Sequence, residues 1–231
     1  MHTPLAILFD LDDTLWPIAP VIARAETAMY AWLEQHAPAV AAAHTIATLR
    51  QRRSVLMASN ARYRYDMWAL RLAALHEVLH DCGEDPTKAH PALEVFSAAR
   101  NQVEPYADVL PALARLGQRY ALGSVSNGAA DLRAIGMAHH FRVSIAAHRF
   151  GQPKPEPAIF LHACAKLGVA PEQAVYVGDD PLLDVAGAQG AGLAGVWMKR
   201  ADASLALPEA VRPDAICASL NELEAWLNAR A

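Results

Sequence analysis

The chain has few of the features that mark secreted, membrane-spanning or disulfide-bonded proteins. Only three of its 231 residues are cysteines, and no two of them form a CxxC pair. An odd, widely spaced set of cysteines argues against a disulfide framework, so we expect a cytoplasmic protein in a reducing compartment. No apolar run reaches the ~18 to 20 residues needed to cross a bilayer. Asp10 interrupts the first apolar run early, so we expect neither a signal peptide nor a membrane partner.

Basic and acidic residues are nearly balanced, and neither kind is concentrated in one part of the chain. The 20 basic residues are opposed by 24 acidic ones, which gives a net charge of −4, and no basic block stands out. This balance disfavours a nucleic-acid partner. A hydrophobic content of 54% instead predicts a well-filled globular core. The length suits one large domain, or a core domain with a smaller one inserted.

The apolar pattern divides the chain into two kinds of sequence. "PLAILFDLD" near the start is a short apolar run typical of a buried strand. Four Ala- and Leu-rich segments with helical spacing follow, the second of which is "AVAAAHTIATLRQRRSVLMAS". Helices and strands then alternate to the end. We therefore predict an α/β fold, a Rossmann-like parallel sheet flanked by helices, with an inserted helical bundle. The expected domains are a core over 1–15 and 104–231 and an inserted domain over 16–103.

Polar residues stand where the expected strands end. The first strand ends in Asp10-Leu11-Asp12, the second in Ser126-Asn127, and a later one in Asp179-Asp180, while Lys154 follows the third. Ligands of open parallel sheets bind at the carboxyl ends of the strands, so these groups should meet in one crevice.

Carboxylates gathered from two strand ends are typical of a Mg²⁺ site, with Asp10 and Asp179 as candidate ligands. A carboxylate not consumed by the metal can act as a nucleophile and form an aspartyl-phosphate. A second carboxylate two residues along can protonate the leaving oxygen and then activate water. A serine hydroxyl and a lysine ammonium would hold the phosphoryl oxygens.

Four motifs occur in one order along the chain: "FDLDDTL", "GSVSNG", "GQPKPEP" and "VGDDPLLD". In this the chain resembles the phosphatases of the haloacid dehalogenase superfamily, and the resemblance covers the core and the position of the inserted domain, which in that family is a cap. The resemblance implies an enzyme that hydrolyses phosphomonoesters with Mg²⁺ as cofactor. It makes Asp10 the nucleophile and a metal ligand, and Asp12 the general acid and base whose carbonyl also binds the metal.

The same resemblance assigns the other site residues. Asp179 matches the second metal carboxylate. Lys154 matches the lysine that contacts both the phosphoryl group and Asp10, and Ser126, with Asn127 beside it, matches the phosphate-binding position. The residues expected to brace or orient the site are Thr14, Asp180 and Asp184. Asp13 matches no role and is expected either to cap the following turn or to have a function that the motif does not define.

Other functions remain open at this point. A 2-haloacid dehalogenase of the same superfamily lacks an acid at the position of Asp12 and needs no metal, whereas a phosphomutase uses the same core residues. A binding-only descendant would be expected to have lost Asp10, Asp12 or Lys154. "HEVLH", with His76, Glu77 and His80, matches the zinc metalloprotease signature, and Glu94 is available as a third ligand. Its place in an Ala- and Leu-rich helix favours a chance match.

The expected partner is a small phosphorylated metabolite, and the expected assembly is a monomer or weak homodimer. A cap closes over the crevice and selects the leaving group. In the cap, "NARYRYDMWALR" offers Tyr63, Arg64, Trp68 and Arg71, which suit a planar or anionic metabolite, although Trp68 is equally suited to the apolar core. "FDLDDTLWPIAPVIARAE" and "SNGAADL" most resemble bacterial flavin-pathway phosphatases, which implies FMN or 5-amino-6-(5-phosphoribitylamino)uracil as substrate. Phosphoglycolate, nucleoside monophosphates and sugar phosphates stay open.

Overall fold

The structure, a computed structural model, describes residues 4–201 and 205–230. Within these residues no helix has both the length and the apolar character that a membrane crossing requires. The chain forms two compact units. Unit 1 comprises residues 1–17, 104–128 and 132–231, and unit 2 comprises residues 18–103 and 129–131.

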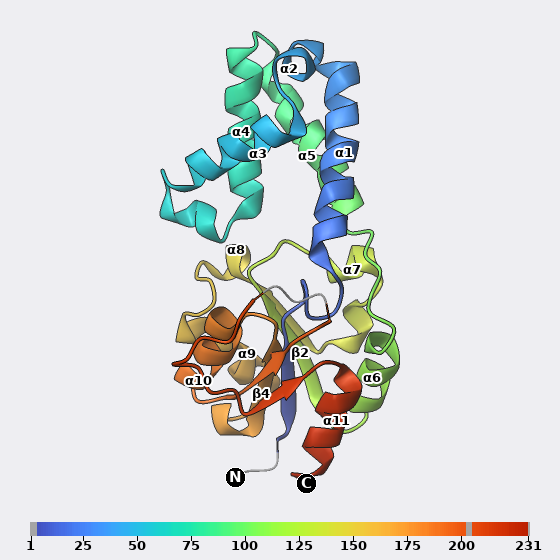
Figure 1. The fold of residues 1–231 in the computed structure, drawn as a ribbon, viewed down its shortest axis with the longest axis vertical. Coiled ribbons are helices and arrows are strands. Elements are labelled where there is room, and N and C mark those ends of the chain that lie inside the picture. The colour runs from blue at the N-terminus through green and yellow to red at the C-terminus, as the bar shows by residue number, and fades with distance from the viewer. Residues whose placement is uncertain (1–3, 202–204, 231) are drawn as a thin grey trace. The chain divides into compact units, whose positions relative to one another are not determined.

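Unit 1 is built on a parallel sheet (Figure 1). In the described part of the chain its strands follow the spatial order β3-β2-β1-β4-β5-β6. The bounds are β1 Ala6–Phe9, β2 Ala121–Ser126, β3 Val143–Ala146, β4 Ala174–Gly178, β5 Ala194–Met198 and β6 Ala215–Cys217. All four residues of β1 and all five of β4 are buried, because these central strands are covered on both faces. This arrangement confirms the predicted fold class.

Helices cover the sheet of unit 1. They are α6 Val109–Leu116, α7 Leu132–Ile135, α8 Ala147–Phe150, α9 Pro157–Leu167, α10 Gly187–Gly190 and α11 Leu220–Asn228. Shorter turns of helix are η3 Ala138–His140, η4 Pro171–Gln173 and the π-helical η5 Pro181–Ala186. Figure 1 shows α6 and α11 on one face of the sheet and α9 and α10 on the other. The chain reverses its direction of winding between β1 and β4, and ligands of such sheets bind at this switch point.

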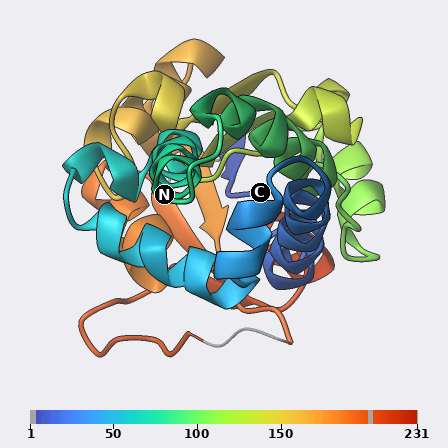
Figure 2. The same cartoon turned by 90° about the horizontal axis from the view of Figure 1, so that it is seen from above.

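Unit 2 is helical. Its elements are α1 Ile18–His36, α2 Pro38–Ala43, α3 Ile46–Met57, η1 Ala61–Arg64, α4 Met67–Asp81, η2 Pro86–Lys88 and α5 Ala89–Arg100. Figures 1 and 2 show α3 crossing α1 and α4 at a steep angle. Buried side chains of α1, α4 and α5, such as Leu33, Leu79 and Leu93, form its apolar core.

Two local expectations differ from the structure. The segment expected as one helix after Pro38 is broken at His44 and Thr45 into α2 and α3, because the Thr45 hydroxyl accepts a hydrogen bond from the Thr48 amide and caps a new helix. The strand β6 was not expected, since "AIC" is too short to show an alternating pattern.

Candidate active site at the carboxyl ends of the central strands

Asp10 and Asp179 follow the last residues of two paired strands. β1 and β4 are in register with Phe9 opposite Val177, and the Asp10 amide donates to the Val177 carbonyl at 2.9 Å. Asp10 follows Phe9 directly, and Asp179 follows Gly178 at the end of β4. Both carboxylates are thus fixed by the register of the sheet, as the strand-end argument predicts.

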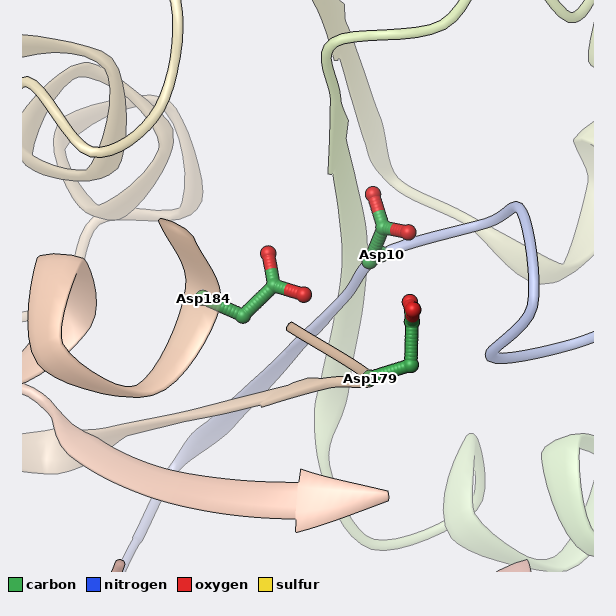
Figure 3. Close-up of side chains that lie close together, drawn as sticks. All are labelled: Asp10, Asp179 and Asp184. Atoms are coloured by element: carbon green, nitrogen blue, oxygen red, sulfur yellow. The ribbon is translucent and has the colours of Figure 1, made fainter. Parts of the chain in front are cut away.

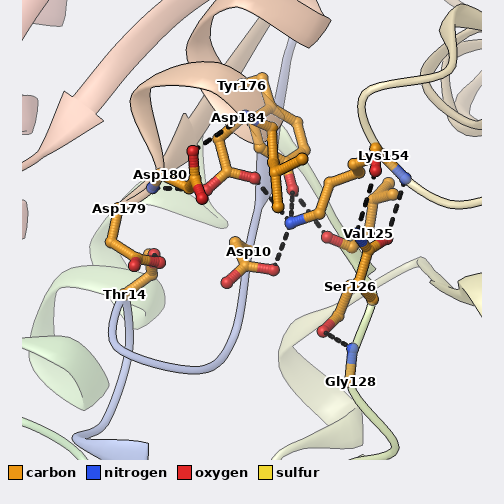
Figure 4. A network of polar contacts seen from close by, with 12 residues as sticks. Asp10, Thr14, Val125, Ser126, Gly128, Lys154, Tyr176, Asp179, Asp180 and Asp184 are labelled. Carbon is orange, nitrogen blue, oxygen red and sulfur yellow. Dashed lines mark hydrogen bonds and ion pairs between the residues drawn. The ribbon is translucent and has the colours of Figure 1, made fainter. Parts of the chain in front are cut away.

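Lys154 links Asp10 to Asp184 (Figure 4). The Lys154 ammonium donates to Asp10 Oδ1 at 2.5 Å and to Asp184 Oδ1 at 2.6 Å, and all three side chains are buried. Burial by itself would lower the pKa of Lys154, but the charges of Asp10 and Asp184 outweigh burial and raise that pKa well above its ordinary value. The lysine is therefore held as a cation beside Asp10.

Tyr176 completes the environment of the lysine. Its hydroxyl accepts the third hydrogen bond of Lys154 Nζ at 2.9 Å and donates to the Val125 carbonyl at 2.7 Å. An ammonium has three donors, and all three are used here. The direction of Lys154 is therefore fixed by β2, β4 and the two carboxylates.

Gly178 makes room for Asp184. A Cβ atom at position 178 would lie 2.2 Å from Asp184 Oδ2, closer than atoms can approach. Asp184 Oδ2 also accepts a hydrogen bond from the Asp180 amide at 2.9 Å. With Oδ1 bound to Lys154, both oxygens of Asp184 already have partners, and its orienting role stays a prediction.

Three carboxylates converge beside the lysine (Figure 3). Oxygens of Asp10, Asp179 and Asp184 lie within 4.8 Å of one another. Burial, and then the charge of Asp184, raises the pKa of Asp179 to about 7. Burial likewise raises the pKa of Asp10 well above its usual range, with Asp184 and Asp179 adding to the effect and Lys154 opposing it.

One ammonium does not neutralise three carboxylates, of which those of Asp10 and Asp184 are buried and that of Asp179 is half-buried. The oxygen donors and the excess negative charge fit a hard divalent cation such as Mg²⁺. Asp10 and Asp179 are the carboxylates best placed to hold it, because both oxygens of Asp184 are engaged. Metal binding through Asp12 stays a prediction.

The loop after β1 is held at several points. The Thr14 hydroxyl is buried and donates to Asp179 Oδ1 at 3.1 Å, and the Trp16 indole donates to Asp12 Oδ1 at 2.9 Å. Asp13 has a φ of 58°, in the left-handed region that aspartate tolerates in turns, and its amide donates to the Trp16 carbonyl. Asp13 therefore shapes the turn that positions Asp12 and Thr14.

Ser126 and Asn127 lie at the end of β2. The Ser126 hydroxyl accepts from the Gly128 amide at 2.9 Å. The Asn127 side chain makes two bonds with the backbone of Lys154: Nδ2 donates to its carbonyl, and Oδ1 accepts from its amide. Asn127 thus fixes the position of Lys154, while phosphate binding by Ser126 and Asn127 stays a prediction.

Asp180 caps the turn after β4, since its Oδ1 accepts from the amides of Leu182 and Leu183 at 2.8 and 3.0 Å. The bracing role expected of Asp180 in the site stays a prediction.

Three residues of this network were not identified from the sequence. Tyr176 is the one side chain with a hydroxyl inside the apolar strand β4, a signal that was available. Trp197 donates from its indole to the Asp179 carbonyl at 2.8 Å, and Arg200 donates to the Thr14 carbonyl. Neither follows a motif, because their partners lie far away in the chain.

The zinc-protease alternative finds no support in α4. Among the residues that the structure describes, the group formed by Asp10, Asp179 and Asp184 is the sole set of His, Cys, Asp or Glu close enough to share a metal ion. The His76 ring instead contacts the His90 ring edge to face at 6.2 Å.

The aspartate after β1, the buried lysine and the acidic pair after β4 lie at the carboxyl ends of the strands of a Rossmann-like sheet, where enzymes of this fold bind their ligands. The family model for haloacid dehalogenase-like hydrolases matches residues 4–192. The chain therefore belongs to this family of enzymes, as its motifs predict.

Similar proteins in this family carry different names. 5-Amino-6-(5-phospho-D-ribitylamino)uracil phosphatase of Escherichia coli strain K12 is 28% identical over 84% of this chain and 83% of its own length. Phosphoserine phosphatase of Thermus thermophilus is 36% identical over 58% of this chain and 57% of its own. The solved structure of a 2-haloacid dehalogenase from Pseudomonas syringae pv. tomato is 36% identical, with a TM-score of 0.90 over 99% of this chain and 100% of that one.

Proposed function

We propose that the chain is a Mg²⁺-dependent phosphomonoester hydrolase that works through an aspartyl-phosphate on Asp10. The observation that carries the proposal is the buried contact between the Asp10 carboxylate and the Lys154 ammonium at 2.5 Å, beside the second acidic group at the end of β4. A nucleophilic carboxylate needs a nearby cation to approach a phosphoryl group of like charge, and Lys154 supplies one.

In the first step an oxygen of Asp10 attacks phosphorus and the bond from phosphorus to the ester oxygen breaks. Asp12 in its acid form gives its proton to the leaving oxygen, so the alcohol departs uncharged. In the second step the Asp12 carboxylate takes a proton from water, the water oxygen attacks phosphorus, and the bond to Asp10 breaks. Asp10 is thereby restored and inorganic phosphate is released.

The remaining residues hold these groups in place. Ser126 would donate to the phosphoryl oxygens, and the Lys154 ammonium, whose three N–H groups are already engaged, would stabilise their negative charge from close by. Thr14, Asp180 and Asp184 orient the carboxylates. Mg²⁺ held by Asp10 and Asp179 would neutralise negative charge on the carboxylates and the phosphoryl group.

The substrate is a small phosphorylated metabolite. The resemblance to flavin-pathway enzymes and the relative from E. coli favour FMN or ribitylaminouracil phosphate, whereas the relative from Thermus is named for an ester that carries a carboxylate. We propose that the enzyme acts in the cytoplasm, in keeping with its free cysteines Cys82, Cys164 and Cys217.

A second candidate is dehalogenation of a 2-haloacid, favoured by the similarity to the Pseudomonas structure. That reaction uses an aspartate nucleophile but needs neither Asp12 nor a metal. The carboxylates of Asp12 and Asp179 in this chain favour phosphate esters.

The test is a comparison of the wild type with Asp10→Asn on two substrates. We expect p-nitrophenyl phosphate to be hydrolysed by the wild type alone, and 2-chloropropionate to release no chloride from either protein. Unchanged ester hydrolysis in Asp10→Asn would contradict the assigned nucleophile, and chloride release by the wild type would favour the second candidate. Equal thermal unfolding of both proteins serves as the control for folding.

A further inference from the structure

Unit 2 contains a partly buried arginine without a polar partner. Arg71 lies in the second turn of α4, and no hydrogen bond or ion pair joins its guanidinium to any residue in the described ranges 4–201 and 205–230. Its Nε is buried. Buried polar groups nearly always have a partner, and a buried N–H of a charged side chain without one is a costly exception.

The contact that Arg71 does make leaves its donors free. The guanidinium lies over the ring of Phe96 on α5, with 4.2 Å from Cζ to the ring centroid. A ring under the face of a guanidinium attracts its charge but accepts none of the hydrogen bonds at its edge. The N–H groups at the edge suit a planar oxyanion, which can accept two parallel hydrogen bonds from them.

Glu26 is the acid whose negative charge acts on Arg71, but its carboxylate is already paired with other arginines. Glu26 of α1 is buried, and both of its carboxylate oxygens accept hydrogen bonds from α3: Oε1 from Arg53 and Oε2 from Arg50. Burial, as the largest cause, and the positive charges of Arg53 and Arg100 together lower the pKa of Arg71 to about 10, and the negative charge of Glu26 opposes them only in part. Arg71 nevertheless stays charged at neutral pH, in surroundings that are short of negative charge.

We propose that Arg71 is the centre of an oxyanion-binding site in unit 2 that takes a small carboxylate or phosphate group. The site combines a cation aligned by Phe96, an adjacent positive field from Arg53 and Arg100, and an acid that cannot serve as the counter-ion. A bound anion would provide both a hydrogen-bond acceptor for the Arg71 N–H groups and a negative charge to balance the guanidinium.

The site is tested first by binding, without reference to catalysis. Glycolate, which has a carboxylate and no phosphate, is titrated at millimolar concentrations while thermal unfolding is followed. We expect glycolate to raise the Tm of the wild type and of Arg52→Met, a control that removes an exposed arginine of α3 paired with Asp81. The shift should be lost in Arg71→Met and restored only in part in Arg71→Lys, which keeps the charge but not the paired donors. An equal shift in Arg71→Met overturns the proposal, as does no shift in the wild type at any concentration.

A second experiment, which rests on the proposed phosphatase function, distinguishes whether the bound anion is part of the substrate or a separate molecule. The ratio of kcat/KM for phosphoglycolate over 2-hydroxyethyl phosphate is measured in each variant, with fructose 1,6-bisphosphate over fructose 6-phosphate as the phosphate pair. If the substrate supplies the anion, we expect the wild type to favour the ester with a second anionic group about tenfold or more, through KM, and Arg71→Met to lose that preference. If a separate anion binds, added glycolate instead changes the rate of hydrolysis of 2-hydroxyethyl phosphate, which has no second anionic group, in the wild type and not in Arg71→Met. If the wild type hydrolysed none of these esters but still showed the rise in Tm with glycolate, the phosphatase function would be wrong and the anion site at Arg71 would still be supported.

Discussion

Arg200 donates two hydrogen bonds to the backbone carbonyl oxygen of Thr14, which lies 186 residues earlier in the chain, at 3.0 and 2.9 Å. The same guanidinium makes two bonds of 2.9 Å with the carboxylate of Asp108 and lies over the ring of Tyr106. Thr14 in turn donates to Asp179. The segment after β5 therefore fixes the loop that carries Asp12, through contacts that are buried or partly buried.

We expect Arg200→Met to lower both stability and turnover. The substitution leaves Asp108 without its cation, which costs up to about 3 to 5 kcal/mol of unfolding free energy, the range for a buried pair. Arg200→Lys keeps the charge but cannot reproduce the paired bonds to Thr14. It should therefore recover most of the unfolding free energy that Arg200→Met loses but little of the lost kcat, with KM little changed. Urea unfolding and steady-state kinetics measure the two effects.

The control for Arg200 is Arg115→Met. Arg115 pairs with Glu224 in a mostly exposed contact, which is worth under about 1 kcal/mol. If Arg200→Lys recovered kcat to the same degree as it recovered the unfolding free energy, the positioning role of Arg200 would be unsupported.

The strand ends of the site could be predicted from the sequence because sheet topology fixes them. In a parallel sheet, Asp10, Ser126 and Asp179 must emerge at the same edge, whatever the details of the helices. The roles of Arg200 and Trp197 could not be predicted, since each acts on a backbone carbonyl that has no sequence signature. A capped break inside an alanine-rich helix, as at Thr45, depends on one hydroxyl and is hidden by the strong helical pattern around it.

Gly178→Ala should displace the carboxylate of Asp184. The added Cβ would overlap Asp184 Oδ2, so the aspartate must move away from Lys154 and from the Asp180 amide. We expect a loss of about 1 to 3 kcal/mol in unfolding free energy, the range for overpacking a tight site. A shift of about 1 Å in the support of Lys154 should lower kcat on the order of 100-fold.

Gly190→Ala provides the matched comparison for Gly178→Ala. A Cβ at position 190 meets no atom within 4 Å, so this change in α10 should leave activity intact and alter stability by under about 1 kcal/mol. Equal kinetic effects from the two alanines would argue against the packing of Asp184 on Gly178.

Mg²⁺ should stabilise the protein as well as activate it. The three carboxylates of the site repel one another when no cation is bound, and a ligand at about 100 times its Kd adds about 2.7 kcal/mol to the unfolding free energy. We expect EDTA to abolish ester hydrolysis and Mg²⁺ to raise Tm in the wild type and in Asp85→Asn, whose carboxylate caps a surface turn of unit 2. Asp179→Asn should lose most of this rise. A rise in Asp179→Asn as large as in the wild type would show that the ion binds elsewhere.

Asp12 and Asp13 are adjacent acids with different expected roles, which makes them a matched pair. Asp12 is held by the Trp16 indole and is proposed to protonate the leaving oxygen, whereas Asp13 occupies the left-handed turn. General acid catalysis contributes about 100- to 10,000-fold, and more for alcohols that leave poorly. Asp12→Asn should therefore slow the hydrolysis of an alkyl phosphate by that factor and that of p-nitrophenyl phosphate much less in the first step. Asparagine also tolerates the left-handed region, so Asp13→Asn should keep nearly normal rates on both esters.

Burst kinetics separate phosphoryl transfer to Asp10 from the hydrolysis of the aspartyl-phosphate by water. The hydrolysis step should be slow in Asp12→Asn for both esters. The same loss on both substrates in the burst phase would contradict proton donation by Asp12, and a comparable loss in Asp13→Asn would assign Asp13 a chemical role as well.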